Sequence, residues 1–252
     1  MLAKERQIYI LSRLKSQPMI SISDLCKEMN VSKSTVQRDL KLLEEQGKVD
    51  RERGGVVQIG LEETISDLTE GPVLEKVNIH QEEKKQIAEI AAKEIRDGDL
   101  IFLDSGTTPM QMIPFLHNKK IKIVTNSYFV LNRLNQLDVE VYMLGGRYSK
   151  KHEICYGPST IEQMQEFRFD KSFIGANGAD IDFGEVYTSE LEIGSIKKAV
   201  IKRSKHAYLL VDDSKFKLTA LSTFGSFEDF EKVFTNKIPE GGKKYKNIIS
   251  TE

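Results

Sequence analysis

One predicted helix near the amino terminus carries polar side chains that suit contact with nucleic acid. At roughly 100° per residue, a helix over 32–45 places Val36 and Leu40 on one side and polar residues on the other. Arginine has the donor geometry to bond guanine and glutamine to bond adenine, whereas hydroxyls and lysine suit phosphates. The candidate DNA contacts on this helix are Ser32, Ser34, Thr35, Gln37, Arg38 and Lys41. Asp39 lies at the flank of this face and could orient a neighbouring arginine.

Polar residues also follow several hydrophobic runs in the rest of the chain. One run ends in a Ser-Gly-Thr-Thr segment directly before Pro109, which can begin a helix. A helix amino terminus offers free amides and a positive dipole end, glycine permits close approach, and hydroxyls add donors. The segment therefore suits a phosphate. Candidate ligand residues here and after the other runs are Asp104, Ser105, Gly106, Thr107, Thr108, Asn126, Ser127, Gly145, Gly146, Asn177, Asp212 and Lys215.

Each of these residues alone is a common turn former and says little. Together they predict a crevice with a phosphate on residues 105–108, sugar hydroxyls on Asp104, Asn126 and Asp212, and a cation from Lys215.

The elements that position the first group have helix-turn-helix spacing. A helix over 4–16 precedes a second helix, which Ser21 or Ser23 can cap and which ends near Asn30. Ser32 can cap the third helix, and Gly47 suits its end. The pattern then alternates over 48–59 around Gly54-Gly55, which predicts a two-stranded wing. Two arginines of this wing could reach phosphates or a minor groove: Arg51 and Arg53.

The remainder of the chain predicts an α/β fold with an open, mostly parallel sheet. A polar linker over 61–75 is followed by alternating helices and strands. The strands are predicted at 100–104, 121–125, 139–144, 171–176 and 207–212, and the helices at 86–96, 109–116, 127–137, 159–167 and 191–204. Such sheets bind ligands at the carboxyl ends of their strands. We therefore predict a winged helix-turn-helix domain over 1–60 and an effector-binding domain over 76–252.

Charge and composition agree with this division. Residues 1–60 contain 11 Lys and Arg against 8 Asp and Glu, a net charge of +3, whereas the whole chain has −1, which leaves −4 for the rest. This asymmetry suits a basic DNA-binding domain joined to a mildly acidic body. No apolar run approaches the roughly 20 residues that cross a bilayer, and no signal-peptide stretch is present, so we expect a cytoplasmic protein.

The cysteines and histidines predict no disulfide, metal site or cofactor. Cys26 and Cys155 fall in different predicted domains, and the four histidines show no ligand spacing. We interpret both sets as structural or surface residues. The tail over 239–252 could be an edge strand or a frayed end.

Residues 1–60 resemble the DNA-binding domain of the DeoR family of bacterial transcriptional regulators. The resemblance lies in the run from Val31 to Leu40 and in Gly54-Gly55. The family usually has arginine where this chain has Gln37, and histidine where it has Arg53. Because both departures touch the DNA-contacting surface, the resemblance does not carry over an operator sequence.

The rest of the chain resembles the sensor domain of the same family, which is similar in fold to ribose-5-phosphate isomerase and typically recognises a phosphorylated sugar. The matching segments are 104–108, 125–127, 144–146, 175–178 and 212–215. Lys84 matches the family's lysine ahead of the first sensor helix, and Lys76 is a weaker match. The resemblance therefore implies that Lys84 contacts the effector.

The alternative from another class is a sugar-phosphate isomerase with an appended DNA-binding domain. It needs a base near the substrate carbons, and Asp180, Asp182, Glu185 or Glu190 could supply one. Solvated loop carboxylates are the more ordinary interpretation, and the resemblance implies binding without turnover. The sequence thus favours a repressor of a sugar-metabolism operon, not an enzyme, acting as a homodimer or homotetramer on paired half-sites of double-stranded DNA.

Overall fold

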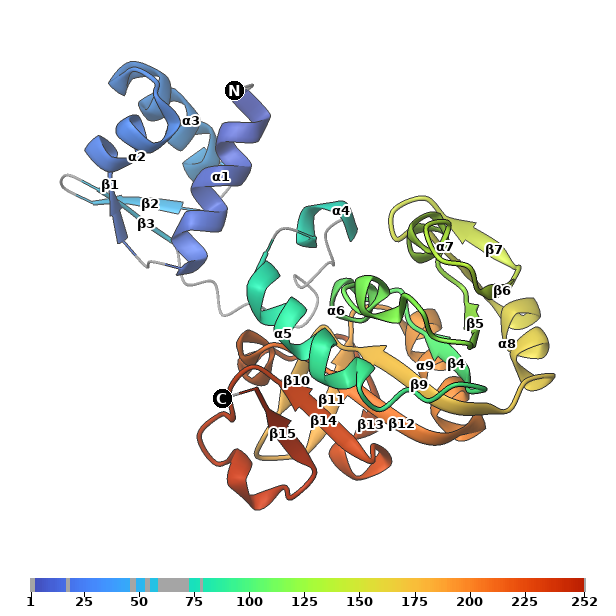
Figure 1. The fold of residues 1–252 in the computed structure, drawn as a ribbon. Coiled ribbons are helices and arrows are strands. Elements are labelled where there is room, and N and C mark those ends of the chain that lie inside the picture. Colours follow the sequence, from blue (N-terminus) through green and yellow to red (C-terminus); the bar gives the residue numbers. More distant parts are fainter. Residues whose placement is uncertain are drawn as a thin grey trace. The chain divides into compact units, whose positions relative to one another are not determined.

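The computed structural model describes residues 3–16, 19–45, 49–52, 55–58, 73–77 and 79–251. The chain divides into two compact units, 1–64 and 65–252, which are drawn together in Figure 1. Each unit has its own hydrophobic core and is described by itself.

The amino-terminal unit packs helices against a small antiparallel sheet. Its helices are α1 (Ala3–Ser16), α2 (Ile22–Met29) and α3 (Lys33–Glu45), and its strands β1 (Met19–Ser21), β2 (Val49–Glu52) and β3 (Gly55–Gln58) lie in the order β1-β3-β2. Ser21 caps α2 by accepting a hydrogen bond from the Asp24 amide at 3.1 Å. Asn30 ends α2 in the left-handed region, with φ 52°. Leu25, Val36 and Leu40 are fully buried between the helices, as the apolar spacing predicts.

The carboxyl-terminal unit is built on a seven-stranded sheet in the order β15-β14-β12-β9-β4-β5-β6. All neighbouring strands in it run parallel. The strands are β4 (Leu100–Leu103), β5 (Lys122–Thr125), β6 (Glu140–Met143), β9 (Phe169–Gly175), β12 (Ser204–Leu210), β14 (Lys232–Thr235) and β15 (Ile248–Ser250). Their carboxyl ends consequently meet at one edge.

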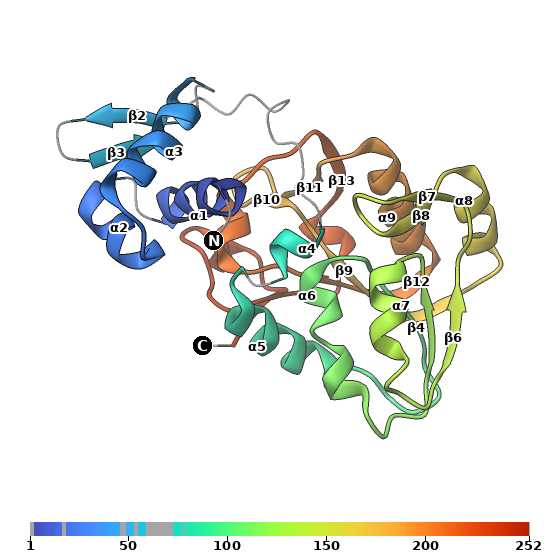
Figure 2. The ribbon, with the colours of Figure 1, turned by 90° about the horizontal axis from the view of Figure 1, so that it is seen from above.

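Helices cover both faces of this sheet, and Figure 2 shows α5 and α9 on opposite sides of it. They are α4 (Val73–Lys76), α5 (Gln81–Ala92), α6 (Thr107–Met110), α7 (Tyr128–Leu134), α8 (Pro158–Gln165) and α9 (Leu191–Arg203). Ile101 and Leu103 of β4 share a core cluster with residues of α5 and α7, whereas Phe102 packs with residues of α8 and α9. Alternate side chains of one strand thus enter two cores, which is why parallel strands are apolar throughout.

Two smaller β structures complete this unit. Strands β10 (Gly178–Asp180), β11 (Glu185–Thr188) and β13 (Ser222–Ser226) form an antiparallel sheet, and β7 (Arg147–Ser149) pairs with β8 (Ile154–Tyr156) as a hairpin. Single 3-10 turns occur at η2 (Ile113–Leu116), η3 (Asp213–Lys217), η4 (Phe227–Asp229) and η5 (Gly242–Lys244).

The predicted α/β fold class is confirmed, and the differences are local. Residues 109–116 do not form one helix, because α6 ends at Met110 and a separate 3-10 turn follows. Helix α5 begins at Gln81, ahead of the predicted 86, because its first turn is acidic and polar and only the later turns carry the apolar period. The tail supplies the edge strand β15. Among the residues that the structure describes, no helix is long and apolar enough to cross a membrane.

Candidate functional site

Helix α3 presents the predicted polar face to solvent. Ser34, Gln37, Arg38 and Lys41 are exposed, whereas Val36 on the opposite side is fully buried. At the start of the helix, the Ser32 hydroxyl accepts a hydrogen bond from the Thr35 amide at 3.3 Å and lies 2.9 Å from the Ser34 hydroxyl. In the wing, the side chain of Arg51 and the whole of Arg53 lie outside the described residues.

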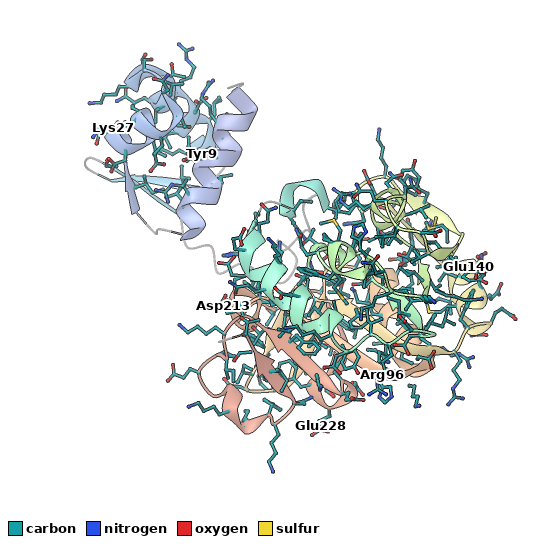
Figure 3. The ribbon with its side chains drawn as sticks, viewed as in Figure 1. Tyr9, Lys27, Arg96, Glu140, Asp213 and Glu228 are labelled. Atoms are coloured by element: carbon teal, nitrogen blue, oxygen red, sulfur yellow. The ribbon has the colours of Figure 1, made fainter. Side chains whose placement is uncertain are left out.

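Asp39 faces inward from α3 and holds α1. It is 1% exposed and accepts two hydrogen bonds from Arg6, at 2.6 Å from Nε and 3.1 Å from Nη2. The arginine that Asp39 orients is therefore Arg6 of α1. This bidentate pair joins α3 to α1. A second tie joins α1 to α2, because Arg13 and Tyr9 (labelled in Figure 3) donate to Glu28 at 2.8 and 3.0 Å. The first contact joins α3 to α1, and the second joins α2 to α1.

In the carboxyl-terminal unit, Asp104 directly follows β4 and is almost completely buried. Its Oδ2 accepts hydrogen bonds from the Gly175 amide at 3.0 Å and from Lys197 Nζ at 2.5 Å. Lys197, on α9, also donates to the Gly175 carbonyl at 3.0 Å and lies over the Phe224 ring. Only Asp104 Oδ1 remains without a hydrogen-bond partner among the described residues. The carboxylate is thus fixed, with one oxygen available to a ligand.

The segment after Asp104 packs closely around Gly106. A Cβ on Gly106 would lie 3.0 Å from Pro109 Cδ and 3.4 Å from the Gly175 Cα atom. Thr107 and Thr108, in the first turn of α6, are buried, and Ser105 is half-buried. The predicted phosphate segment therefore lies beside the Asp104 and Lys197 pair.

A second lysine, Lys84, and a second carboxylate, Asp212, lie near each other where β12 ends. Lys84 of α5 is 4% exposed and its Nζ donates to the Lys76 carbonyl at 2.7 Å. Burial lowers the pKa of Lys84 to about 8. The carboxylate of Asp212 raises this pKa, whereas the positive charge of Lys215 lowers it further. Asp212 is fully buried, accepts bonds at Oδ1 from the Ser214 amide and hydroxyl, and has no partner at Oδ2 among the described residues.

Asn126, at the end of β5, leaves another buried acceptor unpaired. Its Nδ2 donates to the Cys155 carbonyl at 2.9 Å, and its own carbonyl accepts the Cys155 amide at 2.8 Å. Its Oδ1 has no partner within the described residues. The β7–β8 hairpin therefore lies on the end of β5.

Comparison with known proteins identifies both units. The model of the DeoR-like helix-turn-helix domain matches residues 6–60, and that of the DeoR C-terminal sensor domain matches residues 79–237. The chain belongs to the DeoR family. It is a DNA-binding transcriptional regulator.

Relatives of this DeoR-family regulator match over nearly their whole length. The uncharacterized HTH-type transcriptional regulator FruR of Bacillus subtilis is 35% identical over 94% of this chain and 92% of that protein. The glycerol-3-phosphate regulon repressor of Escherichia coli is 30% identical over 93% of this chain and 91% of that protein. Among solved structures, ribose 5-phosphate isomerase A of Methanocaldococcus jannaschii matches at 20% identity with a TM-score of 0.42, over 54% of this chain and 55% of that one.

Several predicted ligand residues have their polar groups engaged within the DeoR-family fold. The Gly145 amide donates to Gln163 at 2.9 Å, and its carbonyl accepts from Thr160 at 2.7 Å. Gly146 has φ +146°, and a Cβ there would lie 2.1 Å from Thr160 Oγ1. Ser127 caps α7 by accepting the Val130 amide at 3.2 Å. Likewise, Asn177 Oδ1 accepts from Thr188 Oγ1 at 3.1 Å, which braces the β10–β11 hairpin.

Three of the four carboxylates nominated for an isomerase also have local partners. Asp180 Oδ1 accepts the amides of Asp182 and Phe183 at 2.7 and 3.0 Å, which closes the turn after β10. Glu185 accepts the Tyr187 hydroxyl at 2.9 Å, and Glu190 pairs with the buried His152 at 2.6 Å. The families that match are regulators, not enzymes. In the described part of the chain, no three His, Cys, Asp or Glu side chains are grouped to hold a metal ion.

Lys197 is the residue that the sequence analysis missed. Ile193, Ile196 and Val200 of α9 are buried at helical spacing, and Lys197 falls on the same face. A lysine inside an apolar stripe was the available signal, since burial of its charge requires a carboxylate partner.

Proposed function

We propose that this regulator represses a sugar-metabolism operon and that a phosphorylated sugar, bound where the parallel strands end, lowers its affinity for operator DNA. The observation that carries the proposal is the convergence of a buried, undercompensated ammonium at Lys84 with an unpaired carboxylate oxygen at Asp212. An anion with hydroxyl groups would satisfy both, since the ammonium needs negative charge and the carboxylate needs donors.

The proposed ligand lies across the ends of β12, β9, β4 and β5. Asp212 and Asn126 mark the two ends of this stretch, three strand spacings or about 14 Å apart. A stretch of this length suits an elongated polyol phosphate. The proposed contacts are Lys84, Asp104, the 105–108 segment, Asn126, Asp212 and Lys215.

The proposed DNA contacts come from the exposed face of α3. Arg38 and Gln37, which are exposed, are proposed to bond base edges, and Lys41 and the hydroxyls at the start of the helix to bond phosphates. Arg51 and Arg53 of the wing remain predictions. One small module covers a short half-site, so we propose that a homodimer or homotetramer binds paired half-sites.

The names of two relatives support the choice of effector class. They include the HTH-type transcriptional repressor GlcR of Bacillus subtilis, at 31% identity, and the Escherichia coli glycerol-3-phosphate regulon repressor. We therefore choose hexose phosphates and glycerol 3-phosphate as probes, together with the parent sugars and glycerol.

A thermal-shift screen followed by operator titration tests the function. We expect one phosphorylated compound, and not its unphosphorylated parent, to raise the melting temperature, because a ligand that binds only the folded state stabilises it. The same compound should weaken operator binding. No stabilisation by any phosphorylated probe would contradict the proposed effector class, and tighter operator binding would make the protein a corepressed regulator.

Effector binding should be accompanied by proton uptake near pH 8. The free protein holds Lys84 with a pKa of about 8, so about half of these ammonium groups are neutral there. A bound phosphate stabilises the charged form and raises this pKa, so the affinity should fall as the pH rises through 8. The phosphate itself stays dianionic in this range, since its second pKa is about 6.

Titration calorimetry in buffers of different ionisation enthalpy measures this uptake. Lys84→Arg is the matched control, because guanidinium stays protonated and its binding enthalpy should not depend on the buffer. If the enthalpy of effector binding to the unmodified protein were the same in all buffers, Lys84 would not bind the anion.

A further inference from the structure

Helix α4 is the first described element after the chain leaves the amino-terminal unit, and the carboxyl-terminal unit holds it at both ends. Val73 packs in the core beside Ile87 and donates its amide to the Lys151 carbonyl, in the turn of the β7–β8 hairpin, at 3.5 Å. At the other end, the Lys76 carbonyl accepts Lys84 Nζ at 2.7 Å. One backbone anchor of α4 therefore depends on a side chain of the proposed effector site.

The ammonium of Lys84 has one partner and capacity for more. It carries three N–H donors, and the bond to the Lys76 carbonyl is the single hydrogen bond that Nζ makes with the described residues. Asp212 and Lys215 are near enough to act on its charge, but no carboxylate lies within ion-pair distance of it in the described part of the chain. The remaining donors are therefore left for an anion.

We propose that Lys84 couples effector binding to the segment that leads to the DNA-binding unit, because the ammonium that receives the anion is also the group that holds α4 through the Lys76 carbonyl. This coupling rests on the proposed function, since it deepens the role of the same site. Effector binding at the end of the sheet would thereby change the contact between α5 and α4.

The direction of the coupling follows from the charge of the donor. While the ammonium lacks a counter-anion, its bond to the carbonyl is charge-assisted and about twice as strong as a neutral bond. A bound phosphate keeps Lys84 protonated but offsets its positive charge and competes for its N–H donors, so the bond to Lys76 weakens. The effector therefore loosens α4, and by thermodynamic reciprocity an operator complex that needs α4 anchored lowers effector affinity by the same factor.

Hydrogen exchange of the backbone amides in the 73–79 peptide of the full chain tests the coupling, with inorganic phosphate as the probe. In the unmodified protein, phosphate should speed exchange by on the order of fivefold, the ratio for the loss of about 1 kcal/mol. Lys84→Met should show the faster exchange without phosphate and no further response. Lys85→Met, which changes the adjacent, exposed lysine and not the anchor, should keep the slow exchange of the unmodified protein when phosphate is absent and the faster exchange when it is present.

Lys84→Gln is the second variant if Lys84→Met does not fold. It keeps an N–H donor without the charge, so its exchange should match that of the phosphate-bound protein and be insensitive to phosphate. Unchanged exchange in a folded Lys84→Met or Lys84→Gln protein overturns the coupling. A phosphate-induced rise in melting temperature without faster exchange also overturns it, while the proposed effector site stands. If phosphate changes neither quantity, both the coupling and the proposed phosphate site are rejected.

Discussion

Replacement of Lys197 by methionine should destabilise the carboxyl-terminal unit by about 3–5 kcal/mol, the cost of removing one partner of a buried ion pair. Methionine preserves most of the volume of the side chain, but it leaves the Asp104 carboxylate, which is 2% exposed, without a countercharge. The Gly175 carbonyl loses a donor at the same time. Denaturant unfolding of the full chain, followed by a probe in the carboxyl-terminal unit, measures the loss.

Two comparisons isolate the cause. Lys198→Met changes the adjacent, exposed lysine and should alter stability by no more than about 0.5 kcal/mol. The double variant Asp104→Asn with Lys197→Met removes both charges, and it should recover part of the loss, since no charge is then left unpaired. A single Lys197→Met variant as stable as Lys198→Met would mean that the pair contributes no stability.

The positions of the strand ends could be predicted because they depend on local patterns. Each parallel strand is a short apolar run, and the first polar residue after it must leave the sheet, as Asp104, Asn126 and Asp212 do. Helix α3 was equally predictable, since its apolar spacing and its cap lie within the helix itself. In contrast, β7, β8 and β10 are strands of 3 residues without clear alternation, and only their pairing partners define them.

Which strand-end residues remain available to a ligand could not be predicted, because that depends on partners distant in sequence. Gly145 is engaged by Gln163 of α8, and Asn177 by Thr188 across a hairpin. Conversely, the fixed orientation of Asp104 depends on Lys197, which is 93 residues away along the chain. Sequence patterns identify polar groups at an edge, but the packing of α8 and α9 decides which of them face a ligand.

Two adjacent residues separate DNA binding from stability, because Arg38 should affect the first and Asp39 the second. Arg38→Ala should weaken operator binding by about 5-fold to 150-fold, or 1–3 kcal/mol, if Arg38 bonds a base edge. Its side chain is exposed and makes no hydrogen bond with the described residues, so the melting temperature should not change. Asp39→Asn should instead lower the stability of the amino-terminal unit, because Arg6 loses its carboxylate.

Lys41→Ala distinguishes base contact from phosphate contact on the same face of α3. It should weaken operator and random DNA about equally and reduce the salt dependence of binding by a slope of about 1, whereas Arg38→Ala should weaken the operator selectively. Footprinting and titration on both kinds of DNA measure the difference. If Arg38→Ala kept its operator affinity with an intact fold, specificity would have to come from Gln37 or from the wing. Because Gln37 and Arg53 are the positions where this chain departs from the usual family residues, the next variants would be Gln37→Ala and Arg53→Ala.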